Sequence, residues 1–203
     1  YNAIIAMDAP GYETAHHAAL KWLDDCFADG KRIYGQAVTV RAAYQFTLEH
    51  WNLYDSSPAW NELTQGSIAE RIDKMQSADM RGRLIADEEI LVTTGVGGPI
   101  SGLIVQETPG HPELAHYCGR TLGDIAAEQG KHHIEVMLDI GIAGDLKVLF
   151  RTNELSSTDH KKVGELVRNQ HIMPGISDGG AHTKFFTGGS FTTDMITWLV
   201  RET

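Results

Sequence analysis

At the start of the chain, the spacing of apolar residues changes from that typical of a strand to that typical of a helix, and then back. Asn2–Met7 is a short apolar run that is typical of a buried strand. Over Glu13–Ala28 the apolar positions recur at helical spacing, and Gly30 follows as a C-terminal cap. Arg32–Val40 then has the β-branched content of a second strand. A strand, a helix and a strand in succession predict a βαβ unit with parallel strands.

The middle of the chain interrupts this alternation. Tyr44–Trp60 is rich in aromatic residues and irregular, and Ile90–Val105 is β-like and rich in glycine. The stretch Ser67–Glu89 is charged and helical in pattern, with Glu70 placed to complete a capping box. We interpret residues 44–110 as an insertion, and as a candidate lid over a site, within one surrounding domain.

Alternation returns after this stretch. Alternating strands and helices occur in open doubly wound sheets and in (β/α)8 barrels. A complete barrel takes about 250 residues, and this chain of 203 residues includes an insertion. We therefore predict an α/β fold in which residues 1–203 form the last few strands of a partial (β/α)8 TIM-type barrel, and we expect the chain to be part of a longer protein. The remaining predicted helices are Pro58–Leu63, Thr121–Gln129, Ile134–Ile142, Thr158–Arg168 (capped by Ser157 or Thr158) and Thr192–Val200, and the remaining strands are Leu146–Phe150 and His171–Ser177.

Composition narrows the class of partner. The net charge of −10 disfavours binding to the phosphate backbone of nucleic acids. No apolar run approaches the roughly 20 residues that a membrane span needs. The two cysteines, Cys26 and Cys118, lack metal-site spacing, and Cys26 falls on an apolar helical face. We expect a cytoplasmic protein that binds a small-molecule substrate, with homo-oligomerisation left open.

The segment that carries candidate chemistry is the end of the predicted strand His171–Ser177, which continues directly into Asp178, Gly179 and Gly180. Parallel α/β folds place their sites at the C-terminal ends of strands. A carboxylate there can bind a divalent metal, or take a proton from metal-bound water. The two glycines allow a sharp turn and the close approach of a ligand. The same residues also fit a common Asp-Gly turn, and the residues alone leave that alternative open.

Three segments carry a family resemblance: His111–Leu114, Gly119–Leu122 with Ile125 and Ala126, and Pro174–His182. They resemble the C-terminal part of the amidohydrolase superfamily, specifically its N-acyl-D-amino-acid deacylase group. The first half of the chain is similar to that group more loosely. The resemblance implies a metal-dependent (β/α)8 barrel that hydrolyses the amide of N-acylated D-amino acids, usually with zinc. It also implies that Asp178 activates the metal-bound water and moves its proton.

The chain departs from the family pattern in its metal ligands. It contains no His-x-His pair, and the apolar run that begins it offers only Asn2 and Asp8 in place of a ligand His. Asp178 is therefore the one candidate metal ligand, with the remaining ligands expected outside this chain. The neighbouring histidines His16-His17 and His132-His133 are not expected to chelate a metal, because adjacent helical positions face different directions. Residues Gly179, Gly180, His182, Lys184 and Arg41 are candidate substrate-binding residues.

These observations lead to two functional hypotheses. The first is a fragment of a metal-dependent hydrolase, with zinc as the expected metal, that cleaves the C–N bond of linear amides such as N-acyl-D-amino acids. Asp178 is its predicted catalytic residue. The second is a non-catalytic barrel relative that binds a small molecule or a protein partner. Under the first hypothesis, we expect this chain alone to be inactive because the other parts of the site are absent from it.

Overall fold

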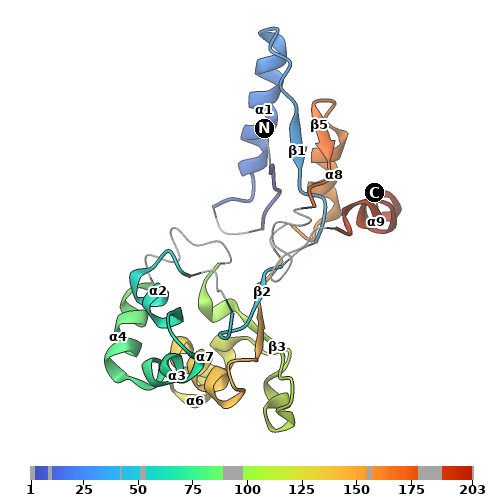
Figure 1. The fold of residues 1–203 in the computed structure, drawn as a ribbon. Helices are drawn as coiled ribbons and strands as arrows, with labels where there is room; N and C mark the ends of the chain where they lie inside the picture. The colour runs from blue at the N-terminus through green and yellow to red at the C-terminus, as the bar shows by residue number, and fades with distance from the viewer. Residues whose placement is uncertain are drawn as a thin grey trace. The chain divides into compact units, whose positions relative to one another are not determined.

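The computed structural model describes residues 3–8, 11–41, 43–50, 54–88, 98–154, 157–177 and 189–202. These residues form a mixed α/β structure with two small open sheets (Figure 1). The predicted α/β class is confirmed at this level, and within the described ranges the strands do not close into a barrel. The chain divides into two compact units. The first unit comprises Tyr1–Ala43 with Glu154–Thr203, and the second unit comprises Tyr44–Asn153.

The sheet of the first unit contains two parallel strands, β1 (Gly35–Ala37) and β5 (Ile172–Pro174). In their register, residue 35 lies opposite residue 172, and residue 37 lies opposite residue 174. Both strands are shorter than predicted, since only these residues pair with one another in the ladder. Figure 1 shows the two strands side by side.

The segment around Ile4 pairs with the opposite edge of β1. The Ile4 amide donates to the carbonyl of Gln36, and the Val38 amide donates to the carbonyl of Ile4, both at 2.9 Å. This contact is a single parallel bridge between Ile4 and Ala37. Helix α1 (Ala15–Ala28) connects the two segments, so the predicted βαβ unit is confirmed, although its first strand is reduced to one paired residue. The Ile4 segment, β1 and β5 thus lie side by side in chain order.

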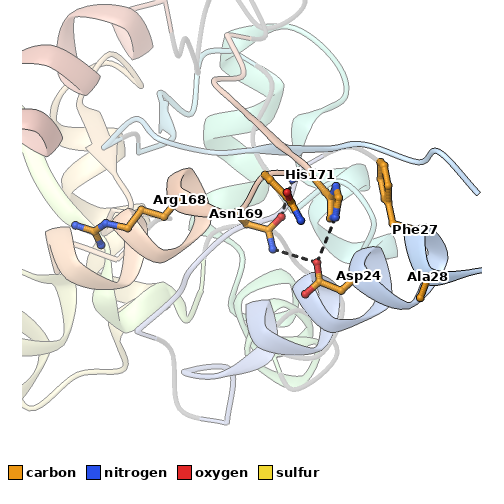
Figure 2. Close-up of a pocket in the computed structure, with 7 residues that line it drawn as sticks. Asp24, Phe27, Ala28, Arg168, Asn169 and His171 are labelled. Carbon is orange, nitrogen blue, oxygen red and sulfur yellow. Dashed lines mark hydrogen bonds and ion pairs between the residues drawn. The ribbon is translucent and has the colours of Figure 1, made fainter.

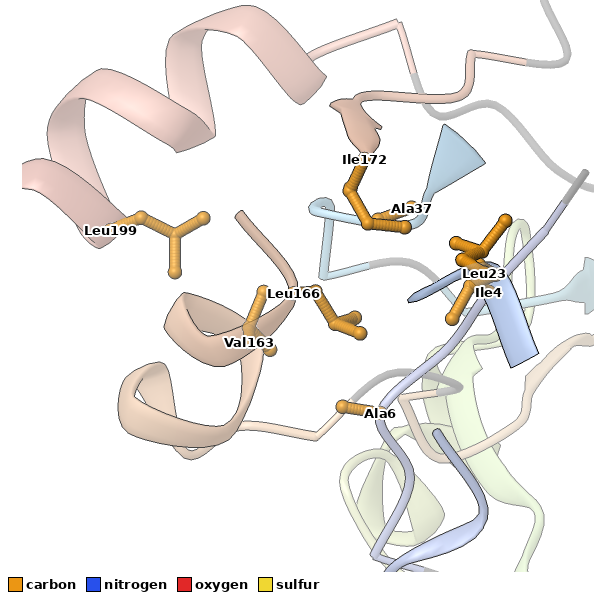
Figure 3. Packing of buried hydrophobic residues seen from close by; sticks show 8 residues of the cluster. All are labelled: Ile4, Ala6, Leu23, Ala37, Val163, Leu166, Ile172 and Leu199. Atoms are coloured by element: carbon orange, nitrogen blue, oxygen red, sulfur yellow. The ribbon is translucent and has the colours of Figure 1, made fainter. Parts of the chain in front are cut away.

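Helices α1 and α8 (His160–Arg168) supply apolar side chains to the core of the first unit. As predicted, Cys26 is a buried free cysteine on α1. The predicted cap of α8 is wrong: the helix begins later than predicted, and Asp159 caps it by accepting from the Lys161 amide. Figure 3 shows the buried cluster, which consists of Ile4, Ala6, Leu23, Ala37, Val163, Leu166, Ile172 and Leu199.

The predicted C-terminal helix of the first unit is present and contains an irregularity. It begins as α9 (Phe191–Asp194), widens into a π-helical segment over Met195–Leu199 and ends as α10 (Val200–Glu202). Leu199 contributes its buried side chain to the core of this unit.

The second unit has a three-stranded antiparallel sheet in the order β2 (Gln45–Phe46), β4 (Leu149–Arg151) and β3 (Ile104–Glu107). Strand β4 therefore does not continue the parallel sheet of the first unit. The predicted insertion over 44–110 falls within this unit. The unit also includes residues 111–153, which we predicted to be part of the barrel. Its helices are α2 (Pro58–Thr64), α3 (Ile68–Gln76), α4 (Ala78–Ala86), α6 (Leu122–Gln129) and α7 (His133–Ala143), with 3-10 turns at Ile100–Gly102 and Pro112–Tyr117.

Local capping signals explain where several of these helices begin and end. The predicted capping box at the start of α3 is confirmed, because Ser67 accepts from the Glu70 amide and the Glu70 carboxylate accepts from the Ser67 amide. The single helix predicted to Glu89 is wrong, because Ser77 has an extended backbone that ends α3, and its side chain caps α4. No helix in the described part of the chain has the length and apolar character needed to cross a membrane.

Candidate functional site

The parallel strands of the first unit bring three chain segments to one sheet edge. Because the strands run in the same direction, their C-terminal ends lie at the same edge, where α/β proteins carry their sites. Asp8 follows the Ile4 segment, Arg41 follows β1, and Ser177 follows β5. The other predicted site residues directly continue the chain beyond Ser177, and they lie outside the described residues: Asp178, Gly179, Gly180, His182 and Lys184.

Asp8 is held at this edge by three donors. Its carboxylate accepts from Lys162 Nζ at 2.7 Å, from Ser157 Oγ at 2.9 Å and from the Thr158 amide at 3.3 Å. The hydrogen bond from Lys162 outweighs partial burial and lowers the pKa of Asp8 below its usual value. Asp8 is thus an ionised carboxylate whose charge is already balanced by an ammonium group. No local pattern predicts this pairing, because Lys162 is 154 residues from Asp8 along the chain.

Arg41 is the one predicted substrate-binding residue that the structure describes. Its guanidinium carbon lies 5.1 Å from the centroid of the Trp198 ring, which is a cation–π contact. A stacked guanidinium keeps its in-plane N–H groups available for a carboxylate. Arg41 therefore remains a candidate for binding an anionic substrate. Among the described residues at this end of the sheet, a neutralised Asp8 and a cationic Arg41 do not form a ligand set for a divalent metal.

The end of β5 is fixed by its contacts with β1. The Gly175 amide donates to the Ala37 carbonyl at 2.9 Å, and the side-chain amide of Gln36 donates to the Gly175 carbonyl at 2.7 Å. Gly175 has a φ of +104°, and a Cβ atom there would overlap the ring of Phe191. Only glycine meets both conditions without strain. These contacts hold the backbone that leads to Ser177 and the candidate catalytic residue.

A broad pocket of about 720 Å³ lies at the opposite end of β5. Figure 2 shows His171 between α1 and β5, where its ring stacks on Phe27 with centroids 3.6 Å apart and its Nε2 lies 3.8 Å from Asp24 Oδ1. Asp24 Oδ1 also accepts from Asn169 Nδ2 at 3.4 Å. Because His171 precedes β5, this pocket adjoins the N-terminal end of the strand, where residues of parallel α/β folds mainly support stability. We assign it a structural role.

Among the described residues, two groups of histidine and glutamate side chains could hold a metal ion. In each group the candidate ligand atoms all lie within 4.8 Å of one another. The premise that neighbouring histidine side chains point apart is therefore wrong for these pairs, while metal binding itself stays untested. Adjacent Cβ atoms diverge on a helix, but rotation about two side-chain bonds brings each pair of ring centroids to 4.1 Å. The groups are His16, His17 and Glu165 in the first unit, and Glu88, His132 and His133 in the second.

Comparison of the chain with protein-family models, with curated proteins and with solved structures found no match. The resemblance to amidohydrolases therefore stays a prediction from the sequence.

Proposed function

We propose that this chain is part of a hydrolase of linear amides, acting on N-acyl-D-amino acids or similar compounds, with Asp178 as its acid–base residue. The observation that carries the proposal is the order of the parallel segments around β1. Consecutive strands of a (β/α)8 barrel lie side by side in chain order, whereas a doubly wound sheet reverses its order at a switch point. The Ile4 segment, β1 and β5 follow the barrel order. In this proposal the second unit is an insertion between the last two barrel strands.

The proposed chemistry needs one carboxylate, which Asp178 supplies in the chain segment that follows β5. Asp178 takes a proton from the attacking water while the water oxygen bonds to the amide carbon. The C–N bond then breaks, and the same carboxyl group returns the proton to the leaving amine. Arg41 binds the carboxylate of the amino acid, and Gly179 and Gly180 allow the substrate to approach the backbone. Zinc remains an expectation of the family resemblance, since the described residues at this edge do not supply its ligands.

The test is the Asp178→Asn variant of the full-length protein, assayed for release of free amine from N-acetyl-D-amino acids. Loss of a general acid–base group lowers turnover by about 10²–10⁴-fold. The matched control is Asp29→Asn, which removes a charge from the exposed C-terminal end of α1. We expect normal turnover in the control and an unchanged thermal midpoint in both variants. Wild-type turnover in Asp178→Asn would rule out the assignment.

The second candidate function is a non-catalytic relative that binds a small molecule or a protein partner. The ion pair between Asp8 and Lys162 favours this second function. The family resemblance leads us to expect a metal ligand after the Ile4 segment, and the carboxylate found there is already neutralised by Lys162. Calorimetry with an N-acetyl-D-amino acid distinguishes the two functions. Saturable binding without release of amine supports the binding protein, and release of amine supports the enzyme.

A further inference from the structure

We propose that His16, His17 and Glu165 bind a divalent transition-metal ion of the zinc type on the helical layer of the first unit. Two of the ligands come from the first turn of α1, and the third comes from α8. Imidazole nitrogens with one carboxylate are ligands that zinc accepts readily. This inference goes beyond the hydrolase proposal, and none of its three residues belongs to the edge that leads to Asp178.

The distances fit a tetrahedral site. With metal–ligand bonds of about 2.0–2.1 Å, neighbouring ligand atoms around tetrahedral zinc lie about 3.3 Å apart. Glu165 Oε2 lies 2.9 Å from His17 Nε2 and 3.5 Å from His16 Nε2. The three ligand atoms all lie within 4.8 Å of one another, and the two distances to Glu165 bracket the value for a tetrahedral ion. The side chains of His17 and Glu165 are 53% and 50% exposed, which leaves the fourth position open to water.

The second observation is the state of the His16 ring. Its side chain is only 1% exposed, and within the described structure neither ring nitrogen makes a hydrogen bond. Buried polar atoms of this kind are almost always satisfied, so an unsatisfied ring calls for an explanation. Its Nε2 is directed towards the Glu165 carboxylate, at a separation longer than an ordinary hydrogen bond to nitrogen. A metal ion between the two groups would give Nε2 a partner.

The corresponding group in the second unit lacks this feature. His132 caps α7, and its Nδ1 accepts a hydrogen bond from the Ile134 amide. In the neutral ring the other nitrogen then carries the proton, so it donates to an acceptor and does not bind a metal. Glu88 lies 3.6 Å from this nitrogen, beyond an ordinary hydrogen bond, but the His132 side chain is 32% exposed and can donate to water instead. Glu88 contacts His133 at 2.5 Å. Hydrogen bonding therefore accounts for the second group, whereas it leaves His16 in the first group unexplained.

Lys162 is a cationic side chain near the proposed site. Lys162 is close enough to His16 to disfavour positive charge on it. Its ammonium group is paired with Asp8 at 2.7 Å, and Asp159 and Glu13 add further negative charge around it. This pairing reduces the repulsion that an ion between the histidines would meet.

The experiment is a zinc titration of the full chain at pH 7.5, against a chromophoric chelator, with magnesium as the comparison ion. We expect one tightly bound zinc per chain and no comparable magnesium binding, because magnesium prefers oxygen ligands. Loss of an outer-shell partner costs about 10–100-fold in metal affinity, and loss of a ligand should cost at least that much. His17→Ala and Glu165→Gln should therefore bind zinc at least about tenfold more weakly. His133→Ala is the matched control and should bind zinc as the wild type does.

Both test substitutions are at half-exposed side chains, so they should leave the fold intact, and the thermal midpoint without zinc checks this. Zinc should raise the thermal midpoint of the wild type and of His133→Ala, but not that of Glu165→Gln, because binding stabilises only the folded state that carries the site. The inference is overturned by a wild type that binds no stoichiometric zinc. It is also overturned by equal zinc affinity in the wild type and Glu165→Gln, or by loss of binding in His133→Ala alone.

Discussion

Gly35 lies at the point where three elements of the first unit meet, and it gives the sharpest test of their packing. A Cβ atom at this position would lie 2.6 Å from Ile4 Cδ1, 2.7 Å from Ile172 Cδ1 and 2.8 Å from Leu23 Cδ1. Ordinary contacts between carbon atoms are about 3.5–4.0 Å. Gly35→Ala would thus force methyl groups from the Ile4 segment, from β5 and from α1 apart by about 1 Å each.

The magnitude follows from two opposing terms. Overpacking a core by one methyl group costs about 1–3 kcal/mol. Replacing glycine by alanine also restricts the unfolded chain, which offsets about 0.4–1 kcal/mol. We therefore expect Gly35→Ala to lower the free energy of unfolding by about 1–2 kcal/mol. Gly82→Ala is the matched control, because a Cβ atom there meets nothing within 4 Å and the residue lies inside α4. This control should be neutral or stabilising by up to about 1 kcal/mol.

Equilibrium urea unfolding of a double-mutant cycle identifies the cause of the loss. Ile172→Val removes the Cδ1 atom that faces Gly35, and alone it should cost about 0.5–1.5 kcal/mol. In the double variant, the new alanine methyl group fills the vacated space. The combined loss should therefore be smaller than the sum of the single losses by about 0.5 kcal/mol or more. Strictly additive losses, or a neutral Gly35→Ala, would refute the described contact between β1 and β5.

Three further predictions concern local features. Gly175→Ala should destabilise the protein by about 1–3 kcal/mol, because its left-handed backbone and the nearby Phe191 ring both oppose a side chain; an unchanged thermal midpoint would contradict this. Ser67→Ala should cost about 1 kcal/mol in urea unfolding through loss of the capping box, and a cost near zero would mean that the box contributes nothing. The hydrogen bond from Lys162 lowers the pKa of Asp8. The ionised Asp8 carboxylate therefore stabilises the folded protein fully above the usual carboxyl pKa of 3.8, and this stabilisation is lost as the pH falls through the lowered pKa. The thermal midpoint of Asp8→Asn should therefore fall less steeply with acidification than that of the wild type, and parallel curves would argue against this role.

Helices were the most predictable part of the fold, because their signals are local. The predicted helix Thr121–Gln129 is an example: Thr121 caps α6 by accepting from the Asp124 amide, and Gly130 ends it in the left-handed conformation. The break between α3 and α4 was missed because Ser77 is a plausible interior residue by spacing. Its role is apparent only from its extended backbone and its side-chain bond to the Met80 amide.

Strand lengths and pairing were less predictable, because they depend on residues far apart in the chain. The apolar pattern of Leu146–Phe150 indicates a strand but carries no information on its partners, and the structure pairs β4 antiparallel with β2 and β3. The proposed metal-binding group of the first unit was missed for the same reason. Its glutamate is 148 residues from His17, and no local pattern links the two.

The measurement that tests the account most directly is hydrolysis of matched N-acetyl-D- and N-acetyl-L-amino acids by the full-length protein. The proposed function predicts release of free amine and acetate from the D-series, with little from the L-series, and loss of this release in Asp178→Asn. No release from any member of either series would contradict the proposed hydrolase, and equal release in Asp178→Asn would contradict the role of its carboxylate.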